Sequence, residues 1–323
     1  MQKKLVIAVG GTGGHVLPAQ KIGAKYKDCY DVIYMGVGLS NNVFFNKQEN
    51  AFHDIDGAGL SKGVINCGIK NFRGLIKAKQ LFKQIQPEFV IGFGSYHSFP
   101  ALAAAAYLGI PYELFEFNVV PGKVNRLFSR GARNVFIHFE PKLKKLHGKL
   151  NYIDYAFEEI TKVSKEEALS HFGLDATKKT ILVFGGSQGA DAINKLIHEA
   201  APQLLNHFQL LHFPGKETAL HESYRDMQMT AHVSAFCHRM DLAWIASDLA
   251  ICRAGAGAMR ELLIYDTPAI LIPYPEAKDN HQAYNAKYIE QIGAGICLLQ
   301  NALTPDLLVA KIFEVLILPK RGG

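Results

Sequence analysis

The sequence Leu-Val-Ile-Ala-Val at residues 5–9 runs directly into Gly-Gly-Thr-Gly-Gly-His at residues 10–15, and this junction decides the fold. A continuous apolar run of this length is typical of a strand that is buried on both faces, as in a parallel sheet. Glycines directly after such a strand let backbone N–H groups approach an anion at the start of the next helix. The junction therefore predicts a strand, a phosphate-binding loop and a helix in succession.

The same pattern occurs at three further places along the chain. These junctions are Phe89–Ile91 before Gly92-Phe93-Gly94, Thr180–Phe184 before Gly185-Gly186-Ser187-Gln188-Gly189, and Leu249–Cys252 before Arg253-Ala254-Gly255-Ala256-Gly257. The first and third loops are about 175 residues apart, and the second and fourth are about 160 residues apart. The repeat predicts two similar domains in tandem, each with two glycine loops.

Strands alternate with helices in both halves, which predicts an α/β fold with parallel sheets and right-handed crossovers. Further strands are expected at Asp31–Met35, Val135–Phe139, Gln209–Phe213 and Ala269–Ile272, and helices at Leu75–Gln86, Ala190–Leu205 and Asn280–Ile292. The apolar rhythm is weakest in Lys149–Lys165, which is rich in lysine and glutamate. We therefore expect two Rossmann-like domains, at residues 1–155 and 156–323.

The composition is that of an ordinary globular protein. The 323 residues are 49% hydrophobic and 20% charged, and this length fits two domains of ~150 residues. The net charge of +6 is uneven, because residues 1–154 contain 20 basic and 10 acidic side chains and residues 155–323 contain 15 and 19. This difference indicates that the two halves face different partners.

Other features exclude membrane-spanning and secreted classes of protein. Apolar runs such as Ala101–Ile110 are well short of the ~20 residues that a transmembrane helix needs, and Leu5–Val9 is too short for a signal peptide. The cysteines have no CxxC pair, which argues against a disulfide framework or a zinc site and fits a reducing cytosol. They are Cys29, Cys67, Cys237, Cys252 and Cys297.

Residues around the glycine loops separate several kinds of enzyme. The GxxxxGK[ST] pattern of a P-loop is absent. The first loop lacks the last glycine of a dinucleotide-binding fingerprint, and the second strand ends without an acidic residue. Gly185-Gly186-Ser187-Gln188-Gly189 fits the GxSxG pattern of a serine hydrolase, with Asp248 and His281 following in the required order. The duplicated glycine loop argues against a hydrolase, so a serine hydrolase remains only a distant alternative.

Six motifs identify a closer resemblance. They are Gly10-Gly11-Thr12-Gly13-Gly14-His15, Gly92-Phe93-Gly94-Ser95-Tyr96, Val120-Pro121-Gly122-Lys123-Val124-Asn125-Arg126, Gly185-Gly186-Ser187-Gln188-Gly189-Ala190, Arg253-Ala254-Gly255-Ala256, and Asp279-Asn280-His281-Gln282-Ala283-Tyr284-Asn285-Ala286. In their order and spacing, from residue 3 to about residue 315, the chain resembles the MurG family of bacterial glycosyltransferases. The resemblance implies the GT-B fold, in which two Rossmann-like domains face each other across a cleft. It also implies transfer of N-acetylglucosamine from UDP-GlcNAc to the MurNAc 4-hydroxyl of lipid I, giving lipid II for peptidoglycan synthesis.

The resemblance further implies roles for individual residues. UDP-GlcNAc would lie mainly against the C-terminal domain, where Glu261 would accept hydrogen bonds from the ribose hydroxyls and the backbone of Cys237 would contact the uracil. Ser187 would contact the diphosphate, His281 and Gln282 the sugar, and the backbone of Ala256, Gly257 and Ala258 the nucleotide. The residues that would close over the sugar and admit the undecaprenyl-linked acceptor are Thr12, Gly13, Gly14, His15 and Asn118.

The implied reaction is an inverting displacement at the anomeric carbon, assisted by a base that deprotonates the acceptor hydroxyl. His15 is the first candidate because imidazole titrates near neutral pH, and its alternative role is to cap the helix after the loop. Glu116, which precedes Asn118 in its motif, is the second candidate base. No carboxylate pair has clear metal-ligand spacing, so we expect neither a metal nor another cofactor.

Three segments of the chain depart from the family pattern. Phe115-Glu116-Phe117-Asn118 stands where the family has His-Glu-Gln-Asn, Asp154 aligns with a family arginine, and Gly255-Ala256-Gly257-Ala258 lacks a threonine. These departures leave two alternatives open. One is a nucleotide-sugar-binding protein with weakened catalysis, and the other is a lipid-directed glycosyltransferase with a different sugar or acceptor.

The stretch from Gly57 to Pro87 contains basic residues but no acidic one. Its inward-facing positions, by helical spacing, are Leu75, Ala78, Phe82 and Ile85. A second face combines apolar and basic side chains, namely Phe72, Arg73, Ile76, Lys79 and Lys83. We expect this face to bind an anionic membrane surface, which would place the protein peripherally at the cytoplasmic face of the plasma membrane. A solvated lysine-rich helix is the alternative, and because no aromatic stacking platform is present we expect no nucleic-acid partner.

Overall fold

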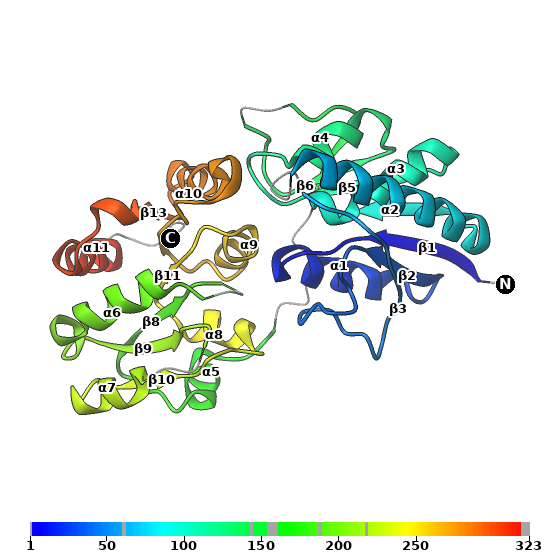
Figure 1. Ribbon diagram of the computed structural model, residues 1–323. Helices are drawn as coiled ribbons and strands as arrows, with labels where there is room; N and C mark the ends of the chain where they lie inside the picture. The colour runs from blue at the N-terminus through cyan, green and yellow to red at the C-terminus, as the bar shows by residue number, and fades with distance from the viewer. Residues whose placement is uncertain are drawn as a thin grey trace. The chain divides into compact units, whose positions relative to one another are not determined.

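The computed structural model describes residues 2–59, 63–142, 145–153, 161–186, 189–216 and 219–317. These residues form two compact units, an N-terminal unit within residues 1–157 and a C-terminal unit within residues 158–323 (Figure 1). Each unit is built on its own parallel sheet. The expected domain boundary at residues 155–156 lies outside the described residues.

The sheet of the N-terminal unit has seven described strands in the order β3-β2-β1-β4-β5-β6-β7. Its strands are β1 (Lys3–Ala8), β2 (Tyr30–Gly36), β3 (Ala51–Asp54), β4 (Phe89–Gly92), β5 (Tyr112–Glu116), β6 (Val135–Ile137) and β7 (Leu150–Tyr152). Its helices are α1 (Gly13–Tyr26), α2 (Val64–Ile85), α3 (Ser95–Leu108), α4 (Lys123–Phe128) and the short 3₁₀ helix η2 (Ser129–Gly131). The strand order reverses between β1 and β4, which are adjacent in the sheet.

Both faces of β1 are covered, because successive side chains of a strand point to opposite faces. Val6 and Ala8 belong to a buried cluster with Ala78 of α2 and residues of α3. On the opposite face, α1 approaches so closely that a Cβ atom on Gly23 would lie 2.9 Å from Cδ1 of Ile7. This double coverage explains why residues 5–9 contain no polar side chain.

The sheet of the C-terminal unit has six described strands in the order β10-β9-β8-β11-β12-β13. Its strands are β8 (Lys179–Phe184), β9 (Phe208–Phe213), β10 (Ala231–Val233), β11 (Leu249–Cys252), β12 (Ala269–Leu271) and β13 (Gly295–Cys297). Its helices are α5 (Lys165–His171), α6 (Asp191–Leu204), α7 (Leu220–Asp226), α8 (Met240–Ala246), α9 (Ala256–Ile264), α10 (His281–Gln291), α11 (Pro305–Ile317), η4 (Lys278–Asn280) and η5 (Gln300–Ala302). The order reverses between β8 and β11, so this unit repeats the central topology of the first.

The C-terminal sheet is also covered on both faces. Ile181 and Val183 of β8 belong to a buried cluster with Ile197 of α6 and Ile312 of α11. On the other face, the ring of Phe184 meets the indole of Trp244 in α8 edge to face, with centroids 5.6 Å apart. Each unit thus has a hydrophobic core of its own.

The predicted α/β class with two parallel sheets is confirmed, and every strand expected from an apolar run is present. The sequence analysis does not predict β3, β5, β7, β10 or β13. The segment in which the apolar rhythm is weakest, Lys149–Lys165, begins with one of these unpredicted strands, because β7 pairs with β6 at the sheet edge. The helix expected at Leu75 begins much earlier, at Val64. None of the helices within the described ranges is long and apolar enough to cross a membrane.

Candidate active site

In both units the motif loops follow the carboxyl ends of strands, where strand order reverses. In the N-terminal unit these are the loops after β1 and β4, and in the C-terminal unit those after β8 and β11 (Figure 1). Open parallel sheets bind ligands in the crevice at such points. The candidate site of each unit therefore lies at these loops.

The first glycine loop passes directly beneath an imidazole. Gly11 has a φ of +92°, and a Cβ atom there would lie 2.9 Å from the ring of His97. The carbonyl oxygen of Gly11 accepts a hydrogen bond of 2.6 Å from Nδ2 of Asn42, in the loop between β2 and β3. Only glycine combines this backbone conformation with this close approach.

The predicted residues after the loop form the start of α1. Thr12 is the exposed N-cap residue, and Gly13, Gly14 and His15 follow as the first three helical positions. Gly14 is exposed and His15 is half-buried. The structure thus brings these four predicted residues together at a helix N-terminus, which favours anions.

Glu116 ends β5 and is only 4% exposed. Its Oε1 accepts hydrogen bonds from the backbone N and the Nδ2 of Asn118, at 3.0 and 3.3 Å. Its Oε2 accepts hydrogen bonds from the backbone N of Gly122, at 2.8 Å, and from Nδ2 of Asn125, at 3.0 Å. The carboxylate therefore fixes the loop that contains Asn118 and the start of α4, and this geometry gives Glu116 a positioning role.

The two phenylalanines beside Glu116 are part of the core. Phe115 is 5% exposed and stacks on Phe93 and Phe136, with centroids 5.1 and 4.7 Å apart. Phe117 is 6% exposed and packs against the imidazole of His138 at 4.9 Å. The departures from the family pattern at these two positions thus lie within an aromatic cluster, while Glu116 and Asn118 retain polar contacts.

In the C-terminal unit, the third glycine loop begins at Gly185 after β8, and Gly189 has a φ of +70°. A Cβ atom on Gly189 would lie 2.6 Å from the carbonyl oxygen of Pro214, the residue that follows β9. The predicted diphosphate ligand Ser187 lies outside the described residues, as does Asp154. The part of the loop that is described is therefore in close backbone contact with the neighbouring loop.

The fourth loop leads into α9, whose first three residues are the predicted nucleotide-lining Ala256, Gly257 and Ala258. Nothing lies within 4 Å of where a Cβ atom on Gly257 would be, so this side of the helix N-terminus is open. Glu261 lies further along α9, and its Oε2 accepts a hydrogen bond of 2.8 Å from Nε1 of Trp244. One carboxylate oxygen is thus oriented by a buried indole.

The predicted sugar-binding residues lie at the start of α10. Asp279 and Asn280 before this helix both have left-handed φ values, 53° and 52°. His281 is the first helical residue, and its Nδ1 lies 2.8 Å from the carbonyl oxygen of Lys278. Oε1 of Gln282 accepts a hydrogen bond of 2.9 Å from the backbone N of Tyr274. Strained backbone of this kind is concentrated at functional sites.

Cys237 lies in the loop between β10 and α8 and is partly buried, which raises the pKa of its thiol. The backbone of this loop is bonded to the loop after β9, because the N–H of Gly215 donates to the carbonyl oxygen of Ala235 at 3.0 Å. The predicted donor-binding residues that the structure describes therefore lie on the loops and helices that follow the carboxyl ends of strands of one sheet.

Comparisons with known proteins agree with this arrangement. Residues 5–137 match the glycosyltransferase family 28 N-terminal domain, and residues 180–321 match the corresponding C-terminal domain. The chain is 36% identical over 338 residues to the UDP-N-acetylglucosamine–N-acetylmuramyl-(pentapeptide) pyrophosphoryl-undecaprenol N-acetylglucosamine transferase of Protochlamydia amoebophila, covering 99% of this chain and 89% of that protein. The protein of the same name from Chlamydia trachomatis serovar L2 is 35% identical over 97% of this chain and 90% of its own length. The chain belongs to the MurG family.

A solved structure supports the family fold. The crystal structure of Acinetobacter baumannii MurG matches with a TM-score of 0.77 at 27% identity, over 98% of this chain and 91% of that one. A glycotransferase of kitacinnamycin matches with a TM-score of 0.70 at 14% identity, over 99% and 92%, and shares the fold. The two parallel-sheet units of this chain therefore have the GT-B fold, and the protein is a glycosyltransferase.

Several residues of this MurG-family site have roles that the sequence analysis does not assign. Arg253 is 8% exposed and donates from Nη1 to the carbonyl oxygens of Ile272 and Pro273, at 3.1 and 3.2 Å. Asn285 is fully buried in α10, and its Nδ2 donates to the carbonyl oxygen of Ala254 at 3.0 Å. Arg253 thus ties the loop after β11 to the segment that follows β12, and Asn285 ties the same loop to α10. Their signal in the sequence is a polar residue within an apolar context, which does not reveal its partner.

The structure overturns the distant serine-hydrolase alternative. Asp248 precedes β11, and its Oδ2 accepts a hydrogen bond of 2.9 Å from the backbone N of Thr180, near the amino end of β8. Its Oδ1 pairs with Nζ of Lys165 at 2.7 Å. The loop that carries the GxSxG pattern begins after the carboxyl end of β8, about 13 Å from Thr180 along the strand. Asp248 is therefore bound at the opposite end of β8 from this loop, as part of the sheet rather than of a triad.

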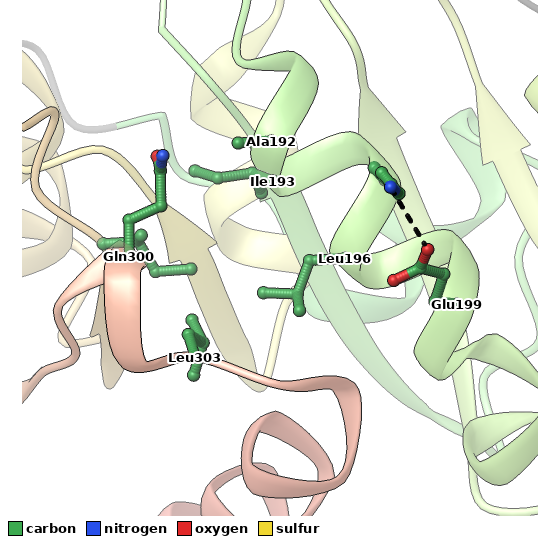
Figure 2. A pocket seen from close by; sticks show the side chains of 8 residues that line it. Ala192, Ile193, Leu196, Glu199, Gln300 and Leu303 are labelled. Atoms are coloured by element: carbon green, nitrogen blue, oxygen red, sulfur yellow. Dashed lines mark ion pairs between the residues drawn. The ribbon is translucent and has the colours of Figure 1, made fainter.

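A hollow of about 230 Å³ lies elsewhere in the C-terminal unit (Figure 2). Figure 2 shows Ala192, Ile193, Leu196 and Glu199 of α6 on one side, and Gln300 and Leu303 on the other. Lys195 and Glu199 form an ion pair at 3.7 Å along the helix. Ligand pockets are commonly ~300 Å³ or larger, and none of the predicted donor-binding residues lines this hollow. Within the described ranges, no group of three His, Cys, Asp or Glu side chains could hold a metal ion.

Proposed function

We propose that this protein transfers N-acetylglucosamine from UDP-GlcNAc to the MurNAc 4-hydroxyl of lipid I, the undecaprenyl-pyrophosphoryl acceptor, and so forms lipid II for peptidoglycan synthesis. The observation that carries the proposal is the 36% identity, over 99% of the chain, to a transferase named for this donor and acceptor. The loops of both units, at the carboxyl edges of their sheets, support it.

The donor is assigned to the C-terminal unit. Glu261 has one carboxylate oxygen bound by Trp244, which orients the group to accept hydrogen bonds from ribose hydroxyls. The N-terminus of α9, with Ala256, Gly257 and Ala258, offers backbone N–H groups to the nucleotide. His281 and Gln282 would bind the sugar, the backbone of Cys237 the uracil, and Ser187 the diphosphate.

The acceptor is assigned to the N-terminal unit, where Thr12, Gly13, Gly14 and Asn118 would admit it. His15 would take the proton from the acceptor hydroxyl, whose oxygen then attacks the anomeric carbon as UDP leaves with the bonding electrons. Glu116 would keep Asn118 in place, because its carboxylate already accepts hydrogen bonds from the backbone and side chain of that residue. N–H groups at helix N-termini would stabilise the leaving diphosphate.

We further propose that the protein is peripheral, at the cytoplasmic face of the membrane, and that α2 binds the anionic lipid surface. Ala78, Phe82 and Ile85 are buried, as their spacing predicts. Phe72 and Ile76 are 63% and 42% exposed, and the exposed stripe continues toward the start of the helix through Ile65 and Ile69. Arg73 and Lys83 flank this stripe in solvent. Nζ of Lys79 lies 3.7 Å from the ring centroid of Tyr107, so the charge of this lysine is held against α3.

The test is transfer of labelled N-acetylglucosamine from UDP-GlcNAc to a lipid I analogue in the presence of the whole chain. We expect a labelled disaccharide-lipid product. Tight UDP-GlcNAc binding without transfer would favour a nucleotide-sugar-binding protein, and transfer to other lipid acceptors alone would favour a different glycosyltransferase. The absence of both binding and transfer would overturn the proposal.

A further inference from the structure

A chain of hydrogen bonds crosses the core of the C-terminal unit through three buried polar side chains. His212 of β9 is 0% exposed, Asn194 of α6 is 6% exposed and Tyr224 of α7 is 1% exposed. Nδ1 of His212 lies 3.0 Å from the Tyr224 hydroxyl, and its Nε2 lies 3.1 Å from Oδ1 of Asn194. Nδ2 of Asn194 donates to the carbonyl oxygen of Pro214 at 3.1 Å.

The carbonyl of Pro214 fixes the direction of every bond in this chain. A carbonyl can only accept, so the amide nitrogen of Asn194 faces Pro214 and its oxygen faces His212. Nε2 of His212 must then carry the proton, and Nδ1 accepts from the Tyr224 hydroxyl. Burial lowers the pKa of His212 to about 3, so the ring is neutral and keeps this arrangement at physiological pH.

This series of hydrogen bonds ends at the short segment 212–215, which touches two loops of the donor site. The carbonyl oxygen of Pro214 lies 2.6 Å from where a Cβ atom on Gly189 would be, against the third glycine loop. The N–H of Gly215 donates to the carbonyl oxygen of Ala235 at 3.0 Å, two residues before Cys237. The N–H of Ser234 donates to the carbonyl oxygen of His212 at 3.2 Å. The segment 212–215 therefore lies between the loop assigned to the diphosphate and the loop assigned to the uracil.

We propose that Asn194, His212 and Tyr224 form a positioning network that sets the spacing between the diphosphate loop and the uracil loop. None of the three is assigned to substrate, so they act through the backbone of Pro214 and Gly215. A fully satisfied buried network specifies one geometry of the groups that it joins, whereas apolar packing tolerates small shifts. The inference rests on the proposed function, because the two loops are donor loops only if UDP-GlcNAc binds here.

The variant Asn194→Asp tests the network at its last bond. As a carboxylate, the aspartate keeps an oxygen for His212 but cannot donate to the carbonyl of Pro214, so both loops lose their common support. We expect KM for UDP-GlcNAc to rise about tenfold, as for the loss of a buried hydrogen bond, with KM for the acceptor and kcat within about twofold. Tyr224→Phe, which removes a bond farther from the loops, should raise the donor KM less.

Ser223→Ala is the matched control. It removes the 2.6 Å contact between the Ser223 hydroxyl and Nε2 of His198, which also joins α6 to α7 but does not reach Pro214. We expect its donor KM to equal that of the wild type. An equal rise in the control, or an unchanged donor KM in folded Asn194→Asp protein, would show that the network is only structural and would overturn the inference.

Hydrogen exchange in ligand-free protein separates this inference from the proposed function. Asn194→Asp should speed exchange in residues 213–216 and 233–237, and Ser223→Ala should not; no change in either segment would overturn the network. If the wild type fails to bind UDP-GlcNAc, the proposed function fails while this measurement still decides the network. If Asn194→Asp does not fold, Tyr224→Phe is compared with Ser223→Ala in the same two assays.

Discussion

His15 lies in the first turn of α1, and its side chain is half-buried. The backbone of Gly11, just before this helix, is fixed by Asn42 and covered by His97. A general base must come within hydrogen-bond reach of the hydroxyl that it deprotonates, and we propose that His15 does so from the start of α1.

We expect His15→Ala to lower kcat by about 10²- to 10⁴-fold, the usual contribution of a general base. UDP-GlcNAc binding should stay within about twofold, because the donor is assigned to the other unit. Steady-state transfer assays measure kcat, and calorimetry measures UDP binding, for the variant and the wild type. His221→Gln, at an exposed histidine, is the control and should keep full activity. A loss of donor affinity that matches the loss of rate would argue against His15 as the base.

Glu116 lends itself to an experiment that separates positioning from catalysis. Glu116→Gln replaces one acceptor oxygen by an NH₂ group that would face N–H donors in a buried site. We expect the free energy of unfolding of the N-terminal unit to fall by about 2–3 kcal/mol, measured by urea unfolding. A large loss of kcat in a variant of wild-type stability would instead identify Glu116 as the base.

His212 makes the stability of the C-terminal unit depend on pH. Burial, with a smaller contribution from the charge of His198, lowers its pKa from 6.5 to about 3. Between these values the unfolded chain binds a proton that the folded protein excludes, so stability from this group is complete above pH 6.5 and decreases toward pH 3. We expect this group to cost about 1.4 kcal/mol for each unit that the pH falls in that range.

Urea unfolding at several pH values between 4 and 7.5 measures this slope. His212→Gln, which cannot titrate, should show a shallower dependence than the wild type by about that amount. Equal slopes in the two proteins would mean that His212 is not held neutral by the fold.

At the scale of elements, apolar runs in the sequence predict the interior strands of the two described sheets except β5, and they miss the edge strands β3, β7, β10 and β13. Residues 5–9 need no polar group because helices cover β1 on both sides. In β5, Glu113 and Glu116 interrupt the apolar pattern. The loop and helix that follow the strand supply the partners of Glu116, whereas Glu113 accepts a hydrogen bond of 2.6 Å from Nδ2 of Asn134, 21 residues away. Local pattern cannot reveal such partners, so this strand escapes prediction.

The candidate site likewise contains one part that is predictable from the sequence and one part that is not. Glycine loops and their spacing place the residues at the helix starts of α1 and α9, because that geometry is encoded locally. The supports of the site are encoded by contacts far apart in the sequence, as between Asn285 and Ala254 or between Trp244 and Glu261. No spacing rule predicts those pairs, and the structure is needed to find them.

The exposed stripe of α2 leads to a prediction about lipid binding. Replacing Phe72 and Ile76 by serine should lower binding to vesicles that contain anionic lipid by about 30-fold or more, since each apolar side chain contributes roughly 1–2 kcal/mol when buried. Cosedimentation measures the change. Val43→Ser is the control, because Val43 is 87% exposed but lies outside α2.

The basic residues beside the exposed stripe of α2 can be tested in the same vesicle assay. Arg73→Glu with Lys83→Glu should also weaken binding, by roughly 30-fold for about 2 kcal/mol of lost attraction, and more at low salt. Vesicle binding that is unchanged by both pairs of substitutions would show that α2 is an ordinary solvated helix.

At the scale of the whole molecule, the uneven charge of the chain follows the division into two units. The surplus of basic residues lies in residues 1–154, the half assigned to a lipid-linked pyrophosphate acceptor and a membrane surface. The half assigned to UDP-GlcNAc has more acidic than basic residues, although its ligand is also an anion. Backbone N–H groups at helix starts bind phosphates without formal charge, which is why the donor half needs no basic surplus.

The chain contains a single tryptophan, and its position beside Glu261 makes it an optical reporter. Trp244 is 1% exposed, so its fluorescence reports on the C-terminal unit alone, while circular dichroism follows both units during unfolding. If ribose hydroxyls bind Glu261, UDP should change the indole emission with a saturable dose response, and Glu261→Gln should weaken that response. An emission spectrum insensitive to UDP, in protein that binds it, would separate Glu261 from the ribose. With the ribose bound to Glu261 as proposed, the hydrogen bond that orients the carboxylate would also give the enzyme a label-free optical signal of donor occupancy.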